Sequence, residues 1–372
     1  MSVKTEICRV HARFAIAFFG MLFAALPTCA AAPSGTATYL GMSSGTYGFD
    51  RPDLWSNGIS PTNEASANYD YILLRVDGSK NNSMRGPETR PTDGLVTVYA
   101  NSFTIGQSNV RGDFRDCRTS DWALEFANDG LVLLRGAFYR DGGRHADGEL
   151  RGSVTVTAPT SRPFNFYGSN NAHGGYRMTG KWTSNSNTAI KFYSVGDDTT
   201  TPFFTVQFLG DMSDFGGQML VESNTCHVLM NGSTLPGTVN VSANATFGAV
   251  AASNVVTVGT LDLADGARLH LPVDNAKSEV ASVRVTSAFS SDGTAGIVLS
   301  ALPKMSGGTK VPLLTLVSGC SGTIGDGELS VSLQDGSALP AKFELVVESD
   351  PSTEDTVLWL SAKQTGLVIS FR

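Results

Sequence analysis

The side chains best suited to acid–base chemistry are the adjacent carboxylates Asp197 and Asp198 and, upstream of them, His173. Two carboxyl groups that flank a sugar linkage can act as acid and base in its hydrolysis. However, the surrounding run from Gly196 to Thr201 has the composition of a turn between strands, because Gly and Asp favour turn conformations. We therefore expect a turn here. Asp197, Asp198 and His173 are kept as the candidate set of an alternative, enzymatic interpretation.

The order of these residues also argues against catalysis. Pectin-degrading hydrolases on β-helix folds carry an Asn-Thr-Asp segment, an Asp pair, a Gly-His-Gly and an Arg-x-Lys, in that order. Here His173 precedes the Asp pair, and the first and last elements are missing. No catalytic residues are predicted, and we do not expect an enzyme.

Metal-ligand patterns are equally sparse. Three histidines lie far apart along the chain, and three cysteines beyond residue 31 lack Cys-x-x-Cys spacing: His145, His227, His270, Cys117, Cys226 and Cys320. Such spacing predicts neither a zinc site nor a disulfide framework. The acidic pairs Asp211/Asp214 and Asp262/Asp265 leave calcium open, but the Gly-Gly-x-Gly-x-Asp repeat of calcium-binding β-rolls is missing. We expect no cofactor and no metal.

Aromatic residues are distributed unevenly. Residues 33–215 contain 24 of them and residues 216–372 contain 5, and all nine tyrosines lie in the first part. The favoured interpretation is a wider core with stacked aromatic side chains. The alternative is that tyrosines, together with Trp55, Trp122 or Trp182, line an exposed surface that binds sugars or a protein partner.

The N-terminal region has the three parts of a secretory signal peptide. Lys4, Arg9 and Arg13 precede an apolar run over residues 14–26, and Ala30–Ala32 follow it. The run is too short to span a bilayer as a helix, which takes about 20 residues. We expect cleavage near Ala31. Because Leu26-Pro27-Thr28-Cys29 resembles a bacterial lipoprotein box, lipidation of Cys29 is the alternative.

The net charge limits the class of partner. The full chain carries −7, and loss of residues 1–31 would leave −9. Together with the lack of a Lys/Arg cluster in the sequence, this charge argues against nucleic acid as a partner. No second apolar segment of spanning length follows the first, so we expect a mature chain without a transmembrane segment.

A repeated Gly-x-apolar-x-apolar pattern is the strongest indication of fold. It begins at Gly217, Gly237 and Gly259, at spacings of 20 and 22 residues, about one coil of a solenoid. Period-two alternation bounded by Gly, Asn, Asp and Ser occurs throughout and is typical of short strands. We predict an all-β, right-handed single-stranded parallel β-helix. A β-sandwich is the alternative, but few strand pairs joined by two-residue turns are found.

Changes in composition and in the spacing of apolar runs along the chain suggest four segments. We predict a signal peptide over 1–31, an N-terminal capping segment over 32–94, the β-helix over 95–275, and terminal coils or a β-rich cap over 276–372. A cap is expected because an uncovered coil end exposes unpaired backbone groups.

A family resemblance follows from several short motifs. The chain contains Trp55-x-x-Gly-x-x-Pro61, then Asp70-Tyr71, then Asn101-Ser-Phe-Thr-Ile-Gly106, then the Gly-x-apolar-x-apolar coils. Together these resemble secreted bacterial β-helix proteins of the autotransporter-associated β-strand repeat type. The resemblance covers about two thirds of the expected mature chain and implies a β-helix at the cell surface or outside the cell.

The sequence therefore predicts an exported bacterial surface or extracellular β-helix with a structural or adhesive role. An extracellular glycan or a surface protein is the expected partner, and the periplasm is the alternative location. The runner-up function is a glycan-binding or glycan-degrading protein with a pectin-lyase-like fold.

Overall fold

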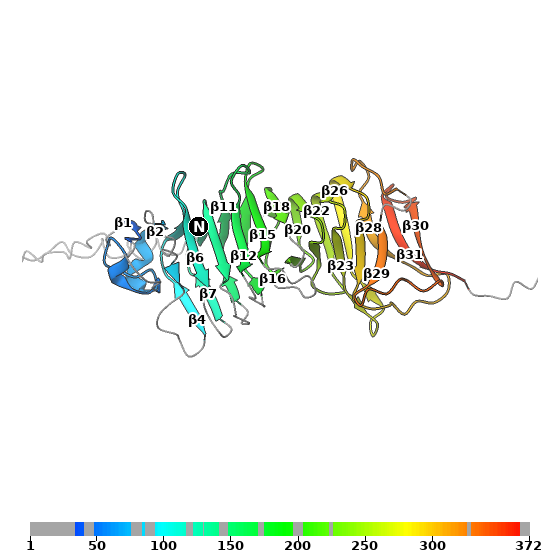
Figure 1. The fold of residues 1–372 in the computed structure, drawn as a ribbon, viewed down its shortest axis with the longest axis horizontal. Helices are drawn as coiled ribbons and strands as arrows, with labels where there is room; N and C mark the ends of the chain where they lie inside the picture. The colour runs from blue at the N-terminus through cyan, green and yellow to red at the C-terminus, as the bar shows by residue number, and fades with distance from the viewer. Residues whose placement is uncertain are drawn as a thin grey trace, which may run out of the picture. The chain divides into compact units, whose positions relative to one another are not determined.

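The computed structural model describes residues 34–40, 48–75, 84–85, 94–116, 122–128, 130–140, 148–169, 175–195, 204–222, 226–325 and 329–364. The fold is all-β, as predicted, with two short 3-10 helices, η2 (Pro52–Leu54) and η3 (Glu64–Asn68). Figure 1 shows the strands following one another in chain order along one stack.

Three sheets run along the stack. Sheet A has seven strands, in the order β1 (Gly35–Thr38), β2 (Tyr69–Leu73), β5 (Ser102–Ile105), β8 (Leu131–Leu133), β11 (Val154–Val156), β14 (Trp182–Ser184) and β17 (Asp214–Phe215).

Sheet B has ten strands, in the order β4 (Leu95–Val98), β7 (Trp122–Phe126), β10 (Gly148–Arg151), β13 (Gly175–Met178), β16 (Phe204–Phe208), β19 (Cys226–Met230), β21 (Thr246–Ala249), β23 (Arg268–Leu271), β27 (Gly296–Leu299) and β29 (Ser330–Leu333).

Sheet C has twelve strands. Their order is β3 (Met84–Arg85), β6 (Gly112–Asp116), β9 (Gly136–Arg140), β12 (Phe164–Ser169), β15 (Ala189–Val195), β18 (Gln218–Val221), β20 (Thr234–Val241), β22 (Val255–Leu263), β26 (Ser282–Ser291), β28 (Lys310–Leu316), β31 (Thr356–Ala362) and β30 (Phe343–Ser349). A separate two-stranded pair joins β24 (Val273–Asp274) to β25 (Glu279–Val280).

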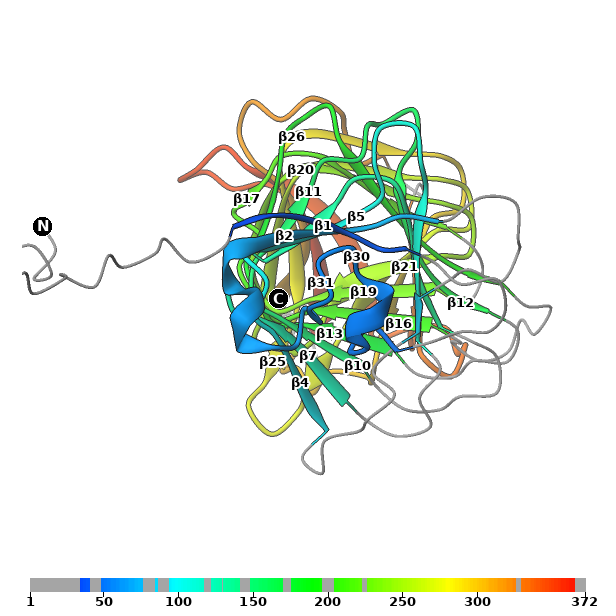
Figure 2. The same cartoon turned by 90° about the vertical axis from the view of Figure 1, so that its left-hand side faces the viewer.

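Successive strands visit the sheets in a fixed rotation. The chain passes from β4 in sheet B to β5 in sheet A and β6 in sheet C, and repeats this path in the next coils. Each strand pairs in parallel with its equivalent one coil later, as β9 does with β12 and β12 with β15. Figure 2, which looks along the stack, shows the coils winding around a common interior. This arrangement confirms the predicted parallel β-helix.

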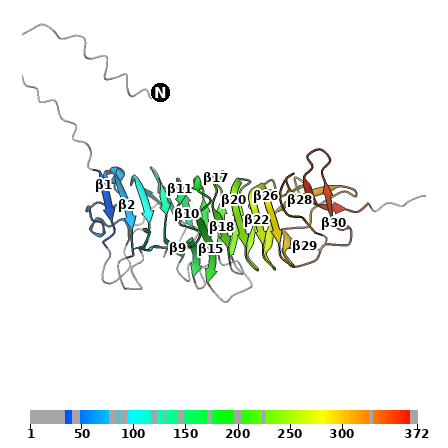
Figure 3. The same ribbon diagram turned by 90° about the horizontal axis from the view of Figure 1, so that it is seen from above.

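The repeated glycines mark the same place in successive coils. Pairing of Gln218 with Thr238, and of Thr238 with Thr260, puts Gly217, Gly237 and Gly259 in one column. A Cβ on Gly237 would lie 2.1 Å from the carbonyl oxygen of Gly217. Only glycine permits so close an approach of neighbouring backbones. From β20 onward one long strand replaces the two shorter strands of sheets A and C, and Figure 3 shows β20, β22 and β26 side by side.

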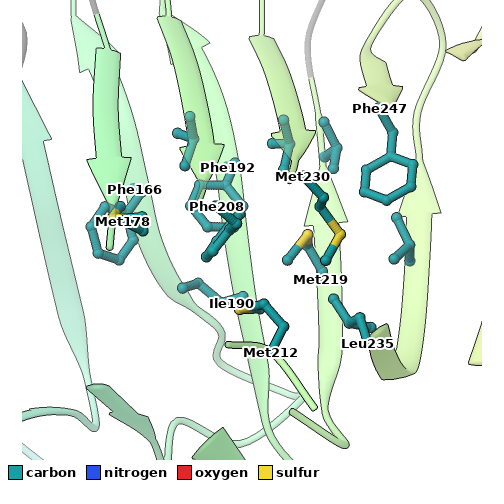
Figure 4. Packing of buried hydrophobic residues seen from close by; sticks show 14 of the residues in the cluster. Phe166, Met178, Ile190, Phe192, Phe208, Met212, Met219, Met230, Leu235 and Phe247 are labelled. Carbon is teal, nitrogen blue, oxygen red and sulfur yellow. The ribbon is translucent and has the colours of Figure 1, made fainter. Parts of the chain in front are cut away.

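Apolar side chains fill the interior of the coils. Phe114, Phe138, Phe166 and Phe192 lie at equivalent positions of consecutive coils, with ring centroids 4.4, 5.4 and 5.5 Å apart. After β17 the core is mainly aliphatic, with Met219 and Met230 near its start, and Figure 4 shows both residues. The favoured interpretation of the aromatic bias, stacked side chains in the core, is confirmed for these phenylalanines.

Parallel pairing extends past both predicted boundaries of the β-helix. It begins at β1 with β2, within the segment predicted as an N-terminal cap, and continues to β27 with β29, beyond residue 275. In sheet C, β31 pairs in antiparallel fashion with both β28 and β30, and β24 and β25 form a second antiparallel pair outside that sheet. Before β31, the buried Asp355 accepts a hydrogen bond from the Ser318 backbone at 2.9 Å and pairs with Arg284 at 3.2 Å. The region 276–372 therefore contains both terminal coils and an antiparallel end.

Candidate functional site

The sequence-predicted acid–base set cannot be located. Asp197, Asp198 and His173 lie outside the residues that the structure describes, so the predicted turn and the enzymatic alternative both stay hypotheses. His145, Cys117 and Cys29 lie outside them too.

Two of the three candidate tryptophans are in the core. Trp55 is 1% exposed and Trp182 is fully buried, because both side chains point into the coil interior. Trp55 Nε1 donates to the carbonyl oxygen of Phe49 at 3.0 Å, and the Trp182 ring packs edge-on against Phe208. The suggestion that Trp55 and Trp182 line an exposed ligand surface is therefore wrong. The side chain of Trp122 is outside the described part of the chain.

Three tyrosines form a row on the outer face of sheet C, which we call the tyrosine ladder. Tyr139, Tyr167 and Tyr193 directly face one another across β9, β12 and β15. Each follows an inward-facing phenylalanine of the Phe138, Phe166 and Phe192 column, and alternation along a strand turns the next side chain outward. All three are partly buried.

The rings of the tyrosine ladder stack on one another. Centroids are 5.0 Å apart between Tyr139 and Tyr167, and 4.9 Å apart between Tyr167 and Tyr193, with interplanar angles of 5° and 16°. Both faces of the Tyr167 ring are therefore covered. A ligand would meet ring edges and hydroxyl groups, so it would bind by hydrogen bonding and edge contact and not by stacking on this ring.

The hydroxyls of Tyr167 and Tyr193 are neutral over the physiological range. Burial raises the pKa of Tyr167 far above its ordinary value, and the neighbouring phenols of Tyr193 and Tyr139 raise it further. Burial also raises the pKa of Tyr193. These groups keep their protons and can both donate and accept hydrogen bonds.

Charged pairs border the ladder. Arg111 Nε donates to Asp113 Oδ1 at 2.6 Å, and Arg75 Nη1 lies 3.8 Å from Asp113 Oδ2. Burial acts to lower the pKa of Arg111, but the carboxylate of Asp113 raises it above its ordinary value. At the far end Lys191 pairs with Glu222, and its Nζ lies 5.3 Å from the centroid of the Tyr193 ring.

The remaining titratable candidates, Cys226, His227 and His270, lie on strands of sheet B. Cys226 is fully buried, and that burial raises the pKa of its thiol. Burial lowers the pKa of His227 to about 4, with a further lowering from His270 and Arg268, and burial lowers the pKa of His270 as well. Neither histidine has a ligand-like neighbour set, since no group of three or more His, Cys, Asp or Glu side chains suited to a metal occurs among the described residues.

The acidic pairs considered for calcium are occupied by local contacts. Lys181 pairs with Asp214 and lies 4.0 Å from Asp211. Ser290 Oγ donates to Asp262 at 2.6 Å, and the backbone of Thr294 donates to Asp265 at 2.9 Å. These contacts explain the lowered pKa of Asp265, which is caused first by the Thr294 side chain.

Sequence reasoning missed the ladder, although a signal for it exists. The dipeptide Phe-Tyr recurs at 138–139, 166–167 and 192–193, at spacings of 28 and 26 residues. If each spacing corresponds to one coil of the solenoid, the recurrence indicates a column of inward-facing phenylalanines and a column of outward-facing tyrosines.

Comparison with known proteins assigns no family. The sequence matches no protein-family model, and no curated protein is similar to it. Among the described residues, no helix has the length and apolar character needed to cross a membrane.

Proposed function

We propose that this chain is an exported bacterial β-helix of the cell surface or extracellular space, with an adhesive or structural role, and that it makes contact through the outer face of sheet C. The observation that carries the proposal is the tyrosine ladder of Tyr139, Tyr167 and Tyr193. The signal-peptide pattern at residues 1–31 and the resemblance to autotransporter-associated repeats support the location.

The ladder suits a contact surface for an energetic reason. Binding costs free energy when rotatable side chains are immobilised, and tyrosines stacked at about 5 Å are already fixed by their neighbours. Tyrosine also combines an apolar edge with a hydrogen-bonding hydroxyl, the combination enriched at recognition surfaces. A row of equally spaced hydroxyls fits a repeating partner, and an extracellular glycan is the partner class that we favour over a surface protein.

A catalytic function has less support. The ladder contains neutral phenols, and the nearby carboxylates of Asp113 and Glu222 are paired with Arg111 and Lys191. Each of these carboxylates is already engaged in an ion pair, whereas cleavage of a sugar linkage uses two carboxyl groups that face the substrate. We therefore propose binding without turnover.

The proposal is tested by a binding screen with the protein lacking residues 1–31. It would be applied to a glycan array and to whole cells, with and without a chelator. We expect binding to at least one extracellular glycan or cell surface, equally strong with the chelator present. Absence of binding to every glycan and cell type would rule out the adhesive role and leave a scaffold.

A further inference from the structure

An open cleft of about 400 Å³ lies at the corner where the chain passes from sheet A to sheet C. Two arginines, Arg135 and Arg162, and two hydroxyl residues, Thr157 and Ser161, line the cleft. Leu134 supplies an apolar part of the lining. The cleft is separate from the core and is formed by turns of consecutive coils.

Coil register explains why two arginines distant in sequence meet here. Arg135 directly precedes β9, and Arg162 lies two residues before β12, the strand that pairs with β9. One coil earlier, Arg111 directly precedes β6, whose Gly112 pairs with Gly136. Adjacent strands are about 4.8 Å apart. Three successive coils therefore place an arginine at the same corner, although the sequence itself shows no basic cluster.

Within the described part of the chain, no carboxylate forms an ion pair with either arginine of the cleft. Arg135 Nη1 donates to the carbonyl oxygen of Ser108 at 2.9 Å, which leaves its other N–H groups for a ligand. Arg111, by contrast, is engaged by Asp113. Lys181 and Lys191 on neighbouring coils each have an acidic partner as well.

We propose that this cleft binds the carboxylate or sulfate group of an acidic saccharide. Guanidinium groups bind such planar or multi-oxygen anions through paired hydrogen bonds. The hydroxyls of Thr157 and Ser161 can exchange hydrogen bonds with sugar hydroxyls, and Leu134 and Pro159 can contact the apolar edge of a ring. The volume is within the range of small-ligand sites, about 300–1,000 Å³, and suits one or two sugar rings. The inference names the ligand class of the adhesive function proposed above and to that extent rests on it.

The test is a titration calorimetry measurement with a soluble uronic acid oligosaccharide, a neutral glucose oligomer of equal length, and inorganic sulfate. The protein lacking residues 1–31 is compared with the variants Arg162→Gln and Arg135→Gln/Arg162→Gln. Arg177→Gln, on the outer face of sheet B, is the matched control. The thermal unfolding midpoint of each variant, measured by circular dichroism, shows whether it is folded.

We expect the acidic oligosaccharide to bind the wild type and the control equally and Arg162→Gln about tenfold or more weakly, because a hydrogen bond to a charged group contributes about 1.5–3 kcal/mol. The neutral oligomer should bind none of them detectably. Equal binding of the acidic oligosaccharide by the double variant and the wild type would overturn the inference. Inorganic sulfate that binds as tightly as the oligosaccharide would also overturn it, since the ligand would then be a simple anion.

These outcomes are distinct from failure of the proposed function. Suppose that the wild type adheres to no cell surface but binds the acidic oligosaccharide, and that the arginine variants do not bind it. The cleft is then an acidic-saccharide site, and the adhesive role is wrong. If the wild type adheres to cells while the double variant binds the oligosaccharide normally, the adhesive role stands and the cleft inference is wrong.

Discussion

At the scale of single residues, the partly buried histidine His227 contributes to the stability of the coils and lies outside the candidate site. Burial of His227 on β19 favours the neutral imidazole, and so do His270 and Arg268 of β23, the strand on the far side of β21. The unfolded chain takes up a proton on this histidine near its ordinary pKa of about 6.5, whereas the folded chain does so only near 4. Protonation at intermediate pH therefore stabilises the unfolded state.

This difference predicts a pH-dependent stability. The contribution of His227 is fully present above about pH 6.5 and is lost as the pH falls toward 4, by about 3 kcal/mol at most. Urea unfolding measured from pH 7.5 to pH 4.5 should show a steep loss of stability in the wild type and a shallower one in His227→Gln. Some slope should remain in the variant because burial also lowers the pKa of His270. Equal slopes in the two proteins would show that His227 is not buried as described.

At the scale of elements, the column of glycines sets how closely neighbouring coils approach. A Cβ on Gly259 would lie 2.0 Å from the carbonyl oxygen of Pro236 and 2.8 Å from that of Gly237. The contacts are with backbone atoms, which cannot move aside as a flexible side chain can. The strands would have to separate or bend.

We therefore expect Gly259→Ala to lower the free energy of unfolding by about 1–3 kcal/mol, the usual cost of overpacking. The matched control is Gly296→Ala on β27, where a Cβ would meet nothing closer than Ser330 Oγ at 3.4 Å. Chemical denaturation of both variants measures the difference. A loss in Gly296→Ala as large as that in Gly259→Ala would contradict the close-approach explanation.

The fold could be predicted from the sequence, but the arrangement of the candidate site could not. Strand alternation and the Gly237 and Gly259 repeats identified the fold, because neighbouring coils there are nearly equal in length. The positions of outward-facing residues were not predictable, because the coil length varies from 19 residues between His227 and Thr246 to 34 between Gly296 and Ser330. Without the register, residues such as Arg135 and Arg162 cannot be assigned to one corner. Burial of Trp55 and Trp182 was likewise decided by which face of a strand each occupies.

At the scale of the whole protein, the proposed function assigns contact with a partner to one face of the β-helix. Sheet C carries the tyrosine ladder on its outer side, and the arginine cleft lies at the corner that precedes the same strands, β9 and β12. One extended partner could therefore contact hydroxyls along the ladder and place an acidic group in the cleft.

The most direct test of this account is whole-cell and glycan-array binding by the triple variant Tyr139→Phe/Tyr167→Phe/Tyr193→Phe. These substitutions keep the stacked rings and remove only the hydroxyls, and Tyr69→Phe on sheet A is the control. Because each lost hydrogen bond costs about 0.5–1.5 kcal/mol, we predict at least tenfold weaker binding by the triple variant and unchanged binding by the control. Binding of the triple variant equal to that of the wild type would contradict a contact through the outer face of sheet C.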